Sequence, residues 1–122
     1  MHHDMHEVLR QGSVRLGPAI LQAKSYNIGA FPGAVLSHDK RDWVQGEAFR
    51  MLRPARLLHL LDQFEDCTPS DPKPHRFVRH VSQVQLRSAR RAIAAWVYLY
   101  NWDVSRARMI VNGRHELGRG WR

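Results

Sequence analysis

One glutamate stands where the pattern of a helix calls for an apolar residue. The segment from Pro54 to Asp66 has apolar residues at helical spacing, and proline suits the first turn of a helix because its missing N–H would be unpaired there. Glu65 follows Leu61 by one turn, so it lies on the shoulder of the buried face. Partial desolvation would raise the pKa of this carboxyl group and suit it to accept and return a proton near neutral pH. The pattern leaves a second interpretation open, in which Glu65 reaches solvent or pairs with an arginine.

Two other sets of residues could form a catalytic or metal-binding site. Cys67 lies eight positions before His75, and a Cys–His pair can act as a nucleophile, but we favour a solvent-facing loop thiol. His2, His3 and His6 could bind a metal, yet no cysteine or positioned carboxylates accompany them, and we favour a frayed terminus. The chain has no glycine-rich phosphate loop, no GxSxG elbow and no Cys/His set at metal-binding spacing. We therefore expect no metal.

The charge of the chain invites a nucleic-acid hypothesis. The net charge is +8 and the isoelectric point is near 10.8, and Lys and Arg bind phosphates with release of counterions. The charges are scattered, however, and only the segments 87–91 and 114–122 are dense, with no interleaved aromatic platform apart from Trp121. A basic nucleic-acid-binding module therefore ranks third among our hypotheses, behind a solvated basic surface on an enzyme or on a ligand-binding domain.

Length and composition indicate one soluble domain. The chain has 122 residues, of which 43% are hydrophobic and 25% charged, which is ordinary for a globular protein with a real core. No apolar run is long enough for a membrane helix, and the N-terminus lacks the apolar core of a signal peptide. The single cysteine fits a reducing compartment. We expect a single cytoplasmic domain over residues 1–122, with no membrane partner and a basic tail over residues 112–122.

Along the sequence, we expect short strands both before and after the one strong helix. Turn residues separate most of the strands, and three prolines make residues 67–75 a loop. We expect short helices over residues 4–11 and 104–111, a break at residues 16–18, a turn at residues 38–42, and strands over residues 19–26, 34–36, 43–51, 77–86 and 92–100. This order predicts an α+β fold, a small, mixed, curled sheet or barrel of about five to six short strands with the helix from Pro54 to Asp66 closing one side. The core candidates are Trp43, Phe64 and Trp96.

Six segments in this order resemble the gamma-glutamylcyclotransferase-like family, also called the butirosin-biosynthesis-like or avirulence-induced family. The resemblance spans nearly the whole chain, and each motif is loose by itself. The matching segments are LGPA at 16–19, GAFPGAV at 29–35, VQGEAF at 44–49, LDQFED at 61–66, FVR at 77–79 and AWVYLYN at 95–101.

The resemblance implies a reaction and a catalytic residue. The glutamate of the L-D-x-[YF]-E segment is the family's acid/base, and it matches Glu65. The implied reaction is the cyclisation of a gamma-glutamyl amine or amino acid to 5-oxoproline with release of the amine, which needs no cofactor. Arg79, Tyr98 and Tyr100 lie on strands that could line the pocket, with sheet packing and surface charge as the equal alternative. We assign Asp62 to the helix border without a functional role.

The chain departs from the family at its start. The resemblance implies a first strand and a Y-G-[ST]-L loop that grips the substrate, and this chain has neither. We therefore expect an N-terminally incomplete domain, a catalytically inactive member that binds a small ligand or a protein, or a sheet completed by a partner, for which a homodimer is one option because a lost strand exposes an edge.

Overall fold

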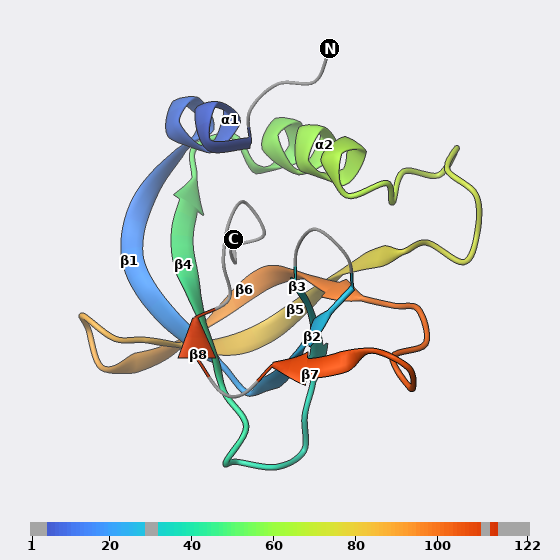
Figure 1. Ribbon diagram of the computed structural model, residues 1–122. Helices are drawn as coiled ribbons and strands as arrows, with labels where there is room; N and C mark the ends of the chain where they lie inside the picture. The colour runs from blue at the N-terminus through green and yellow to red at the C-terminus, as the bar shows by residue number, and fades with distance from the viewer. Residues whose placement is uncertain (1–4, 29–31, 111–112, 115–122) are drawn as a thin grey trace.

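The computed structural model describes residues 5–28, 32–110 and 113–114, and over these residues the fold is α+β, as the sequence predicts (Figure 1). The helices are α1 (Met5–Gly12) and α2 (Pro54–Phe64). The strands are β1 (Ser13–Leu21), β2 (Ala23–Asn27), β3 (Pro32–Leu36), β4 (Val44–Met51), β5 (Phe77–Leu86), β6 (Arg91–Tyr100), β7 (Arg108–Ile110) and β8 (Gly113–Arg114). The described strands are thus more numerous than the five to six expected.

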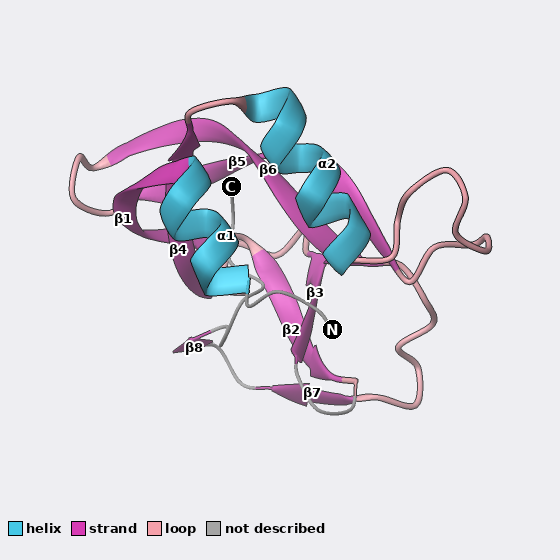
Figure 2. Cartoon of the chain, turned by 90° about the horizontal axis from the view of Figure 1, so that it is seen from above, coloured by secondary structure: helices cyan, strands magenta, loops and turns pink. Residues whose placement is uncertain are grey.

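These strands form two sheets that curl toward each other. The larger sheet has the order β6-β5-β1-β4-β8, antiparallel except for the two-residue parallel pairing of β8 with β4, and the smaller has the order β3-β2-β7. The chain crosses from one sheet to the other at Gln22, between β1 and β2. Hydrogen bonds do not close the described strands into a barrel. Both helices lie side by side over one end of the larger sheet (Figures 1 and 2).

A bulge takes the place of the break expected at residues 16–18. β1 runs through this segment, and its register against β4 shifts between Arg15 and Gly17. Gly17 has φ +123°, a conformation that residues with side chains rarely adopt. The strand continues through Pro18 because it bends at the bulge, and the extra residue of the bulge increases the local twist of the strand. This bend accounts for the curvature of β1 visible in Figure 1.

Two hydrophobic cores lie on opposite faces of β6. Strands β1 to β6 all contribute to the larger core, in which Val97 and Leu99 are buried. Tyr98, between them in sequence, faces the other way, because side chains alternate along a strand. It joins Leu9, Leu57 and Leu61 in the smaller core beneath the helices. The predicted core residues Trp96 and Phe64 are half-buried, whereas Trp43 is 38% exposed.

Two other expectations are corrected near the ends of elements. Helix α2 ends at Phe64, so Glu65 is its C-cap residue, and Asp66 has φ 56°. The short helix expected over residues 104–111 is wrong, because residues 108–110 form β7 and pair with β2. A sheet pairing distant in sequence overrides local propensity in so short a segment. Most of the predicted basic tail lies outside the described residues.

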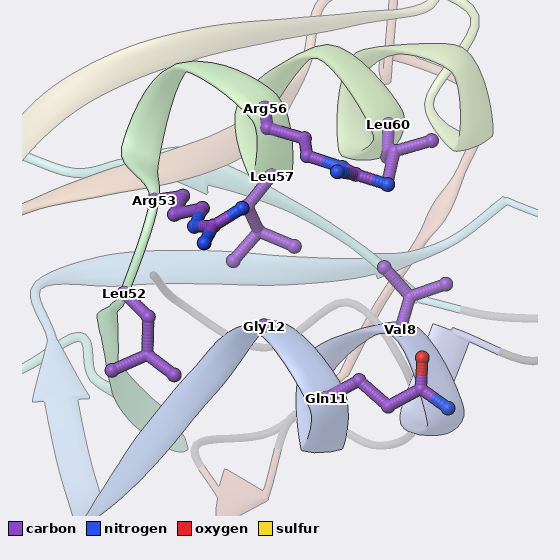
Figure 3. A pocket seen from close by; sticks show the side chains of 8 residues that line it. All are labelled: Val8, Gln11, Gly12, Leu52, Arg53, Arg56, Leu57 and Leu60. Carbon is purple, nitrogen blue, oxygen red and sulfur yellow. The ribbon is translucent and has the colours of Figure 1, made fainter.

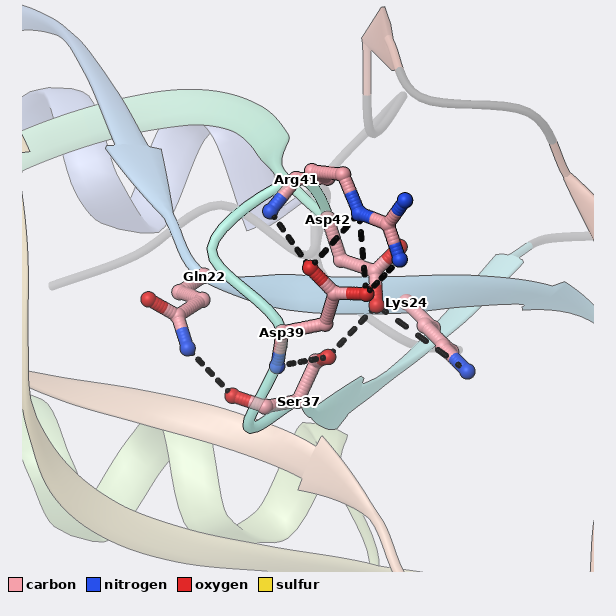
Figure 4. Close-up of polar contacts among 6 residues, drawn as sticks. All are labelled: Gln22, Lys24, Ser37, Asp39, Arg41 and Asp42. Atoms are coloured by element: carbon pink, nitrogen blue, oxygen red, sulfur yellow. Dashed lines mark hydrogen bonds and ion pairs between the residues drawn. The ribbon is translucent and has the colours of Figure 1, made fainter.

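The polar turn predicted at residues 38–42 is confirmed, and polar side chains shape it (Figure 4). The Ser37 hydroxyl donates to a carboxylate oxygen of Asp42 at 2.5 Å and accepts from the Asp39 amide at 3.1 Å. Gln22, directly after β1, makes two hydrogen bonds with Ser37. Its backbone carbonyl accepts from the Ser37 amide, and its side-chain amide donates to the Ser37 carbonyl. These bonds fix the path from β3 to β4.

Candidate active site

Glu65 lies at the C-terminal end of α2 and is fully buried, with 0% of its surface exposed. Its backbone N–H donates to the Leu61 carbonyl at 3.0 Å, which continues the helical pattern one residue beyond the last turn. It is the one buried acidic residue in the part of the chain that the structure describes. The prediction that Glu65 faces the buried side is confirmed, and the alternative of a side chain that reaches solvent is wrong.

One turn before Glu65, the carboxylate of Asp62 contacts three side chains from other parts of the chain. Arg79 donates from Nε to Oδ1 at 2.9 Å and from Nη2 to Oδ2 at 3.2 Å. The Tyr98 hydroxyl donates to Oδ1 at 2.5 Å, and the Cys67 thiol lies 3.7 Å from the same oxygen. We call these four residues the Asp62 cluster. Charge-assisted, bidentate pairs of this kind combine strength with fixed geometry.

The β5–β6 hairpin explains why Arg79 and Tyr98 meet at one carboxylate. The two residues are direct cross-strand partners, so their side chains lie on the same face of the sheet. Helix α2 covers that face, and Asp62 points toward it. The Arg79 guanidinium also lies 4.5 Å from the centre of the Trp96 ring. The arginine is therefore held between a carboxylate and an aromatic ring.

Tyr100 belongs to a different group. Its ring makes edge contacts with Phe77 at 5.6 Å and with Trp102 at 6.4 Å between ring centres. The Arg76 guanidinium lies 6.0 Å from the Tyr100 ring and 5.7 Å from the Trp102 ring. Of the three substrate-binding residues predicted from the sequence, the structure thus brings Arg79 and Tyr98 together and places Tyr100 in a separate aromatic cluster.

Cys67 is not the solvent-facing loop thiol expected from the sequence. It is half-buried and packs against the smaller hydrophobic core. Burial, and next the charge of Asp62, raise the pKa of the Cys67 thiol to about 12. The thiol is therefore protonated at neutral pH, whereas a nucleophilic cysteine needs the thiolate. This finding speaks against a Cys67–His75 nucleophile pair.

The contacts of Asp62 could not be predicted from the sequence, which assigns this residue to the helix border without a role. The available signal is spacing, because residues three apart on a helix share a side, and Asp62 precedes Glu65 by three positions. The partners Arg79 and Tyr98 lie 17 and 36 positions away in sequence, so local patterns carry no information about them.

A cavity of about 590 Å³ opens beyond the C-terminal end of α2. Its lining includes charges of both signs from Asp66, Asp71, Lys73 and Arg76, together with Trp102. The Asp71 carboxylate already accepts hydrogen bonds from the hydroxyl and, next in effect, the backbone N–H of Thr68, and both lower its pKa. Within the described residues, no group of three or more His, Cys, Asp or Glu could hold a metal ion, and no described helix has the length and apolar character needed to cross a membrane.

Comparison with known proteins gives a match over nearly the whole chain. A family model described as gamma-glutamyl cyclotransferase, AIG2-like, matches residues 1–118. No curated protein and no solved structure matches the chain. The matched range includes Glu65 and the whole Asp62 cluster.

Proposed function

The chain belongs to the gamma-glutamyl cyclotransferase, AIG2-like family, and from this premise we propose that it cyclises a gamma-glutamyl amine or amino acid to 5-oxoproline with release of the amine. The α-amine of the glutamyl group attacks its own γ-carbonyl, and the bond from that carbon to the leaving nitrogen breaks. One proton leaves the attacking nitrogen and one reaches the leaving nitrogen. No electrons are transferred, so the reaction needs no redox cofactor.

Glu65 is our candidate for the group that moves the proton. Burial disfavours the charged form of a carboxylate, so a buried glutamate can take a proton from the attacking amine and return it to the leaving nitrogen. The observation that carries the proposal is the complete burial of Glu65, which is the residue that the resemblance of the LDQFED segment matches to the family's acid/base. The substrate brings its own nucleophile close to its carbonyl, so the protein supplies mainly position and proton transfer.

We propose that the Asp62 cluster positions the end of α2 and therefore Glu65. Arg79 and Tyr98 tie the last turns of the helix to the β5–β6 hairpin. Arg79, one of the substrate-binding candidates, can in addition bind a substrate carboxylate, because its side chain is 28% exposed and a guanidinium has five N–H groups, of which Asp62 uses two. Tyr98 is 4% exposed, and its hydroxyl donates to Asp62 from beneath the helix.

The cavity beyond α2 suits the substrate class. A gamma-glutamyl amino acid carries an ammonium group and carboxylates, and the cavity presents both acidic and basic side chains, Asp66 and Lys73 among them. We propose that the substrate approaches through this cavity, which Arg76 and Trp102 line. The Arg76 guanidinium lies over the rings of both Tyr100 and Trp102.

The test is a chemical assay on the purified chain. A panel of gamma-glutamyl amino acids and gamma-glutamyl amines is incubated with the protein, and 5-oxoproline, glutamate and free amine are measured by mass spectrometry. We expect 5-oxoproline and amine in equal amounts from at least one substrate. N-acetylated versions are the matched control, because a blocked α-amine cannot attack. Release of glutamate instead would mean hydrolysis, and binding without any product would favour the alternative of a catalytically inactive, ligand-binding member.

A further inference from the structure

A groove lies between α1 and α2, toward the opposite end of α2 from Glu65. It encloses about 410 Å³. Its lining consists of Val8, Gln11, Gly12, Leu52, Arg53, Arg56, Leu57 and Leu60 (Figure 3). A helix rises 1.5 Å per residue, so along the helix axis Arg53 lies about 18 Å and Leu60 about 8 Å from Glu65. The lining of the groove shares no residue with the Asp62 cluster or with the cavity beyond α2, and binding of a ligand there does not depend on the proposed cyclisation.

The floor of the groove is apolar and close-packed. Leu57 is 3% exposed and belongs to the smaller hydrophobic core. A Cβ atom at Gly12 would lie 3.1 Å from Leu57 Cδ1, so glycine lets α1 come close to α2 at this point. Leu52, at the end of the groove, is 54% exposed. An apolar surface recessed between two helices suits an apolar group of a ligand.

The rim of the groove on the α2 side carries two positive charges at the N-terminus of this helix, where positive side chains are unfavourable. Arg53 is the N-cap residue of α2 and makes no capping hydrogen bond with its side chain, and Arg56 is the third residue of the helix. Capping side chains such as Asp or Ser are preferred at the first position and Glu at the other, because the N-terminus of a helix has a partial positive charge. The first turn of α2 contains no acidic residue. This arrangement lowers the stability of the helix unless an anion is present.

No described carboxylate neutralises the two arginines. Glu7, the acidic residue in the first turn of α1, is already engaged, because Arg10 donates to it at 2.6 Å and Gln11 at 3.0 Å. Figure 3 shows both arginine side chains along the α2 edge of the groove. The groove therefore combines an apolar floor with a positive rim that pairs with no carboxylate among the described residues.

We propose that this groove binds a single-chain anionic amphiphile. The anionic head group would pair with Arg53 and Arg56, with the alkyl chain against Val8, Leu57 and Leu60. An extended peptide fits less well, since it needs main-chain hydrogen bonds and the walls are helices whose backbone groups are paired internally. A membrane surface also fits less well, because Leu57, on the floor of the groove, is recessed and only 3% exposed.

The binding test uses the fluorescent fatty acid 11-(dansylamino)undecanoic acid as probe. The probe should gain fluorescence on the full chain, and dodecanoate should displace it at a concentration at least 10-fold below that of dodecanol. The alcohol is the matched control because it has the same chain without the charge. Equal displacement by the two compounds would overturn the proposal. Preferential binding of the protein to phosphatidylserine vesicles, without binding of the monomeric probe, would also overturn it in favour of a membrane surface.

A charge-reversed variant separates a ligand site from a structural role. Arg53→Asp with Arg56→Glu supplies the capping residues that a helix prefers, so this variant should melt at a higher temperature than the wild type. The same variant should bind the probe at least 10-fold more weakly. Arg91→Glu with Arg106→Glu is the control, since both arginines are exposed and far from the groove in sequence, and it should bind the probe as the wild type does.

A second variant tests the groove without altering the charge of its rim. Val8→Trp narrows the groove without removing either arginine, and Val8 is half-buried at the groove wall. Probe binding should fall at least 10-fold in this variant while its far-ultraviolet circular dichroism stays that of the wild type. Undiminished binding in folded Val8→Trp would place the probe elsewhere and overturn the proposal.

Discussion

Asp62 and Arg79 form a bidentate ion pair that joins helix α2 to the β5–β6 hairpin, with both N–H···O distances between 2.9 and 3.2 Å. Side-chain exposures of 17% and 28% place this pair partly out of water. A partly desolvated, bidentate pair holds its geometry better than a surface pair does. Glu65, one turn further along α2, therefore has its position fixed relative to the hairpin.

Asp62→Asn should lower the free energy of unfolding by roughly 1–3 kcal/mol, because Arg79 loses its charged partner in a partly buried site. Chemical denaturation with urea measures the change. Asp39→Asn is the control, since Asp39 pairs with Arg41 at the surface, and its effect should be clearly smaller. Equal effects for the two variants would mean that the cluster is no more than another surface contact.

Tyr98→Phe should act in the same direction with a smaller magnitude. It removes one hydrogen bond to Asp62 and leaves the ring in the smaller core, so we expect a loss of roughly 0.5–1.5 kcal/mol. If Asp62 and Tyr98 act as one unit, the double variant will lose less stability than the two single losses added together. Additive losses in the double-mutant cycle would argue against a cluster.

Cys67 should react slowly with iodoacetamide in the folded protein. Its pKa is raised from 9.0 to about 12, so below pH 9 the thiolate fraction is about 1000-fold lower in the folded than in the unfolded chain. The stabilisation from the protonated thiol is complete below pH 9 and disappears as the pH rises toward 12. Alkylation followed by mass spectrometry measures the rate, and a native rate close to that in urea would contradict the burial of this thiol.

The β3–β4 loop should keep its structure in acid. Hydrogen bonds from the Arg41 side chain, and next from its backbone, lower the pKa of Asp39 to about 2. A lowered pKa means that the carboxylate stabilises the fold above the ordinary value of 3.8 and that this contribution is lost as the pH falls through 2. A carboxyl-detected NMR titration should show the Asp39 midpoint near 2, and a midpoint near 3.8 would mean that the pair with Arg41 does not persist in solution.

Lys73→Gln tests the proposed route of the substrate. Lys73 is an exposed residue of the cavity beyond α2, so its loss should raise KM for a gamma-glutamyl amino acid about 2- to 5-fold without a change in kcat. Lys40→Gln, in the loop between β3 and β4, is the matched control. An unchanged KM in Lys73→Gln would show that the substrate takes another path.

Elements with a long periodic pattern could be predicted from the sequence, and relations between distant residues could not. The helix α2 and the β5–β6 hairpin follow from local periodicity, which also places Glu65 on the shoulder of the buried face but does not decide its complete burial. The partners of Asp62 depend on how the hairpin and the helix pack, which no local pattern encodes. β7 exists because β2 offers it a pairing edge, and β1 continues past Pro18 because a bulge absorbs the irregularity.

The role of Glu65 in proton transfer is tested by comparing 5-oxoproline release by the wild type with that by Glu65→Gln, a variant of nearly identical shape. Glu47→Gln, on β4 and ion-paired with Arg15, is the matched control. If Glu65 is the acid/base, kcat should fall by about 10²- to 10⁴-fold in Glu65→Gln and stay unchanged in Glu47→Gln, with equal thermal unfolding curves. A folded Glu65→Gln protein that keeps the wild-type rate would contradict the assignment of Glu65.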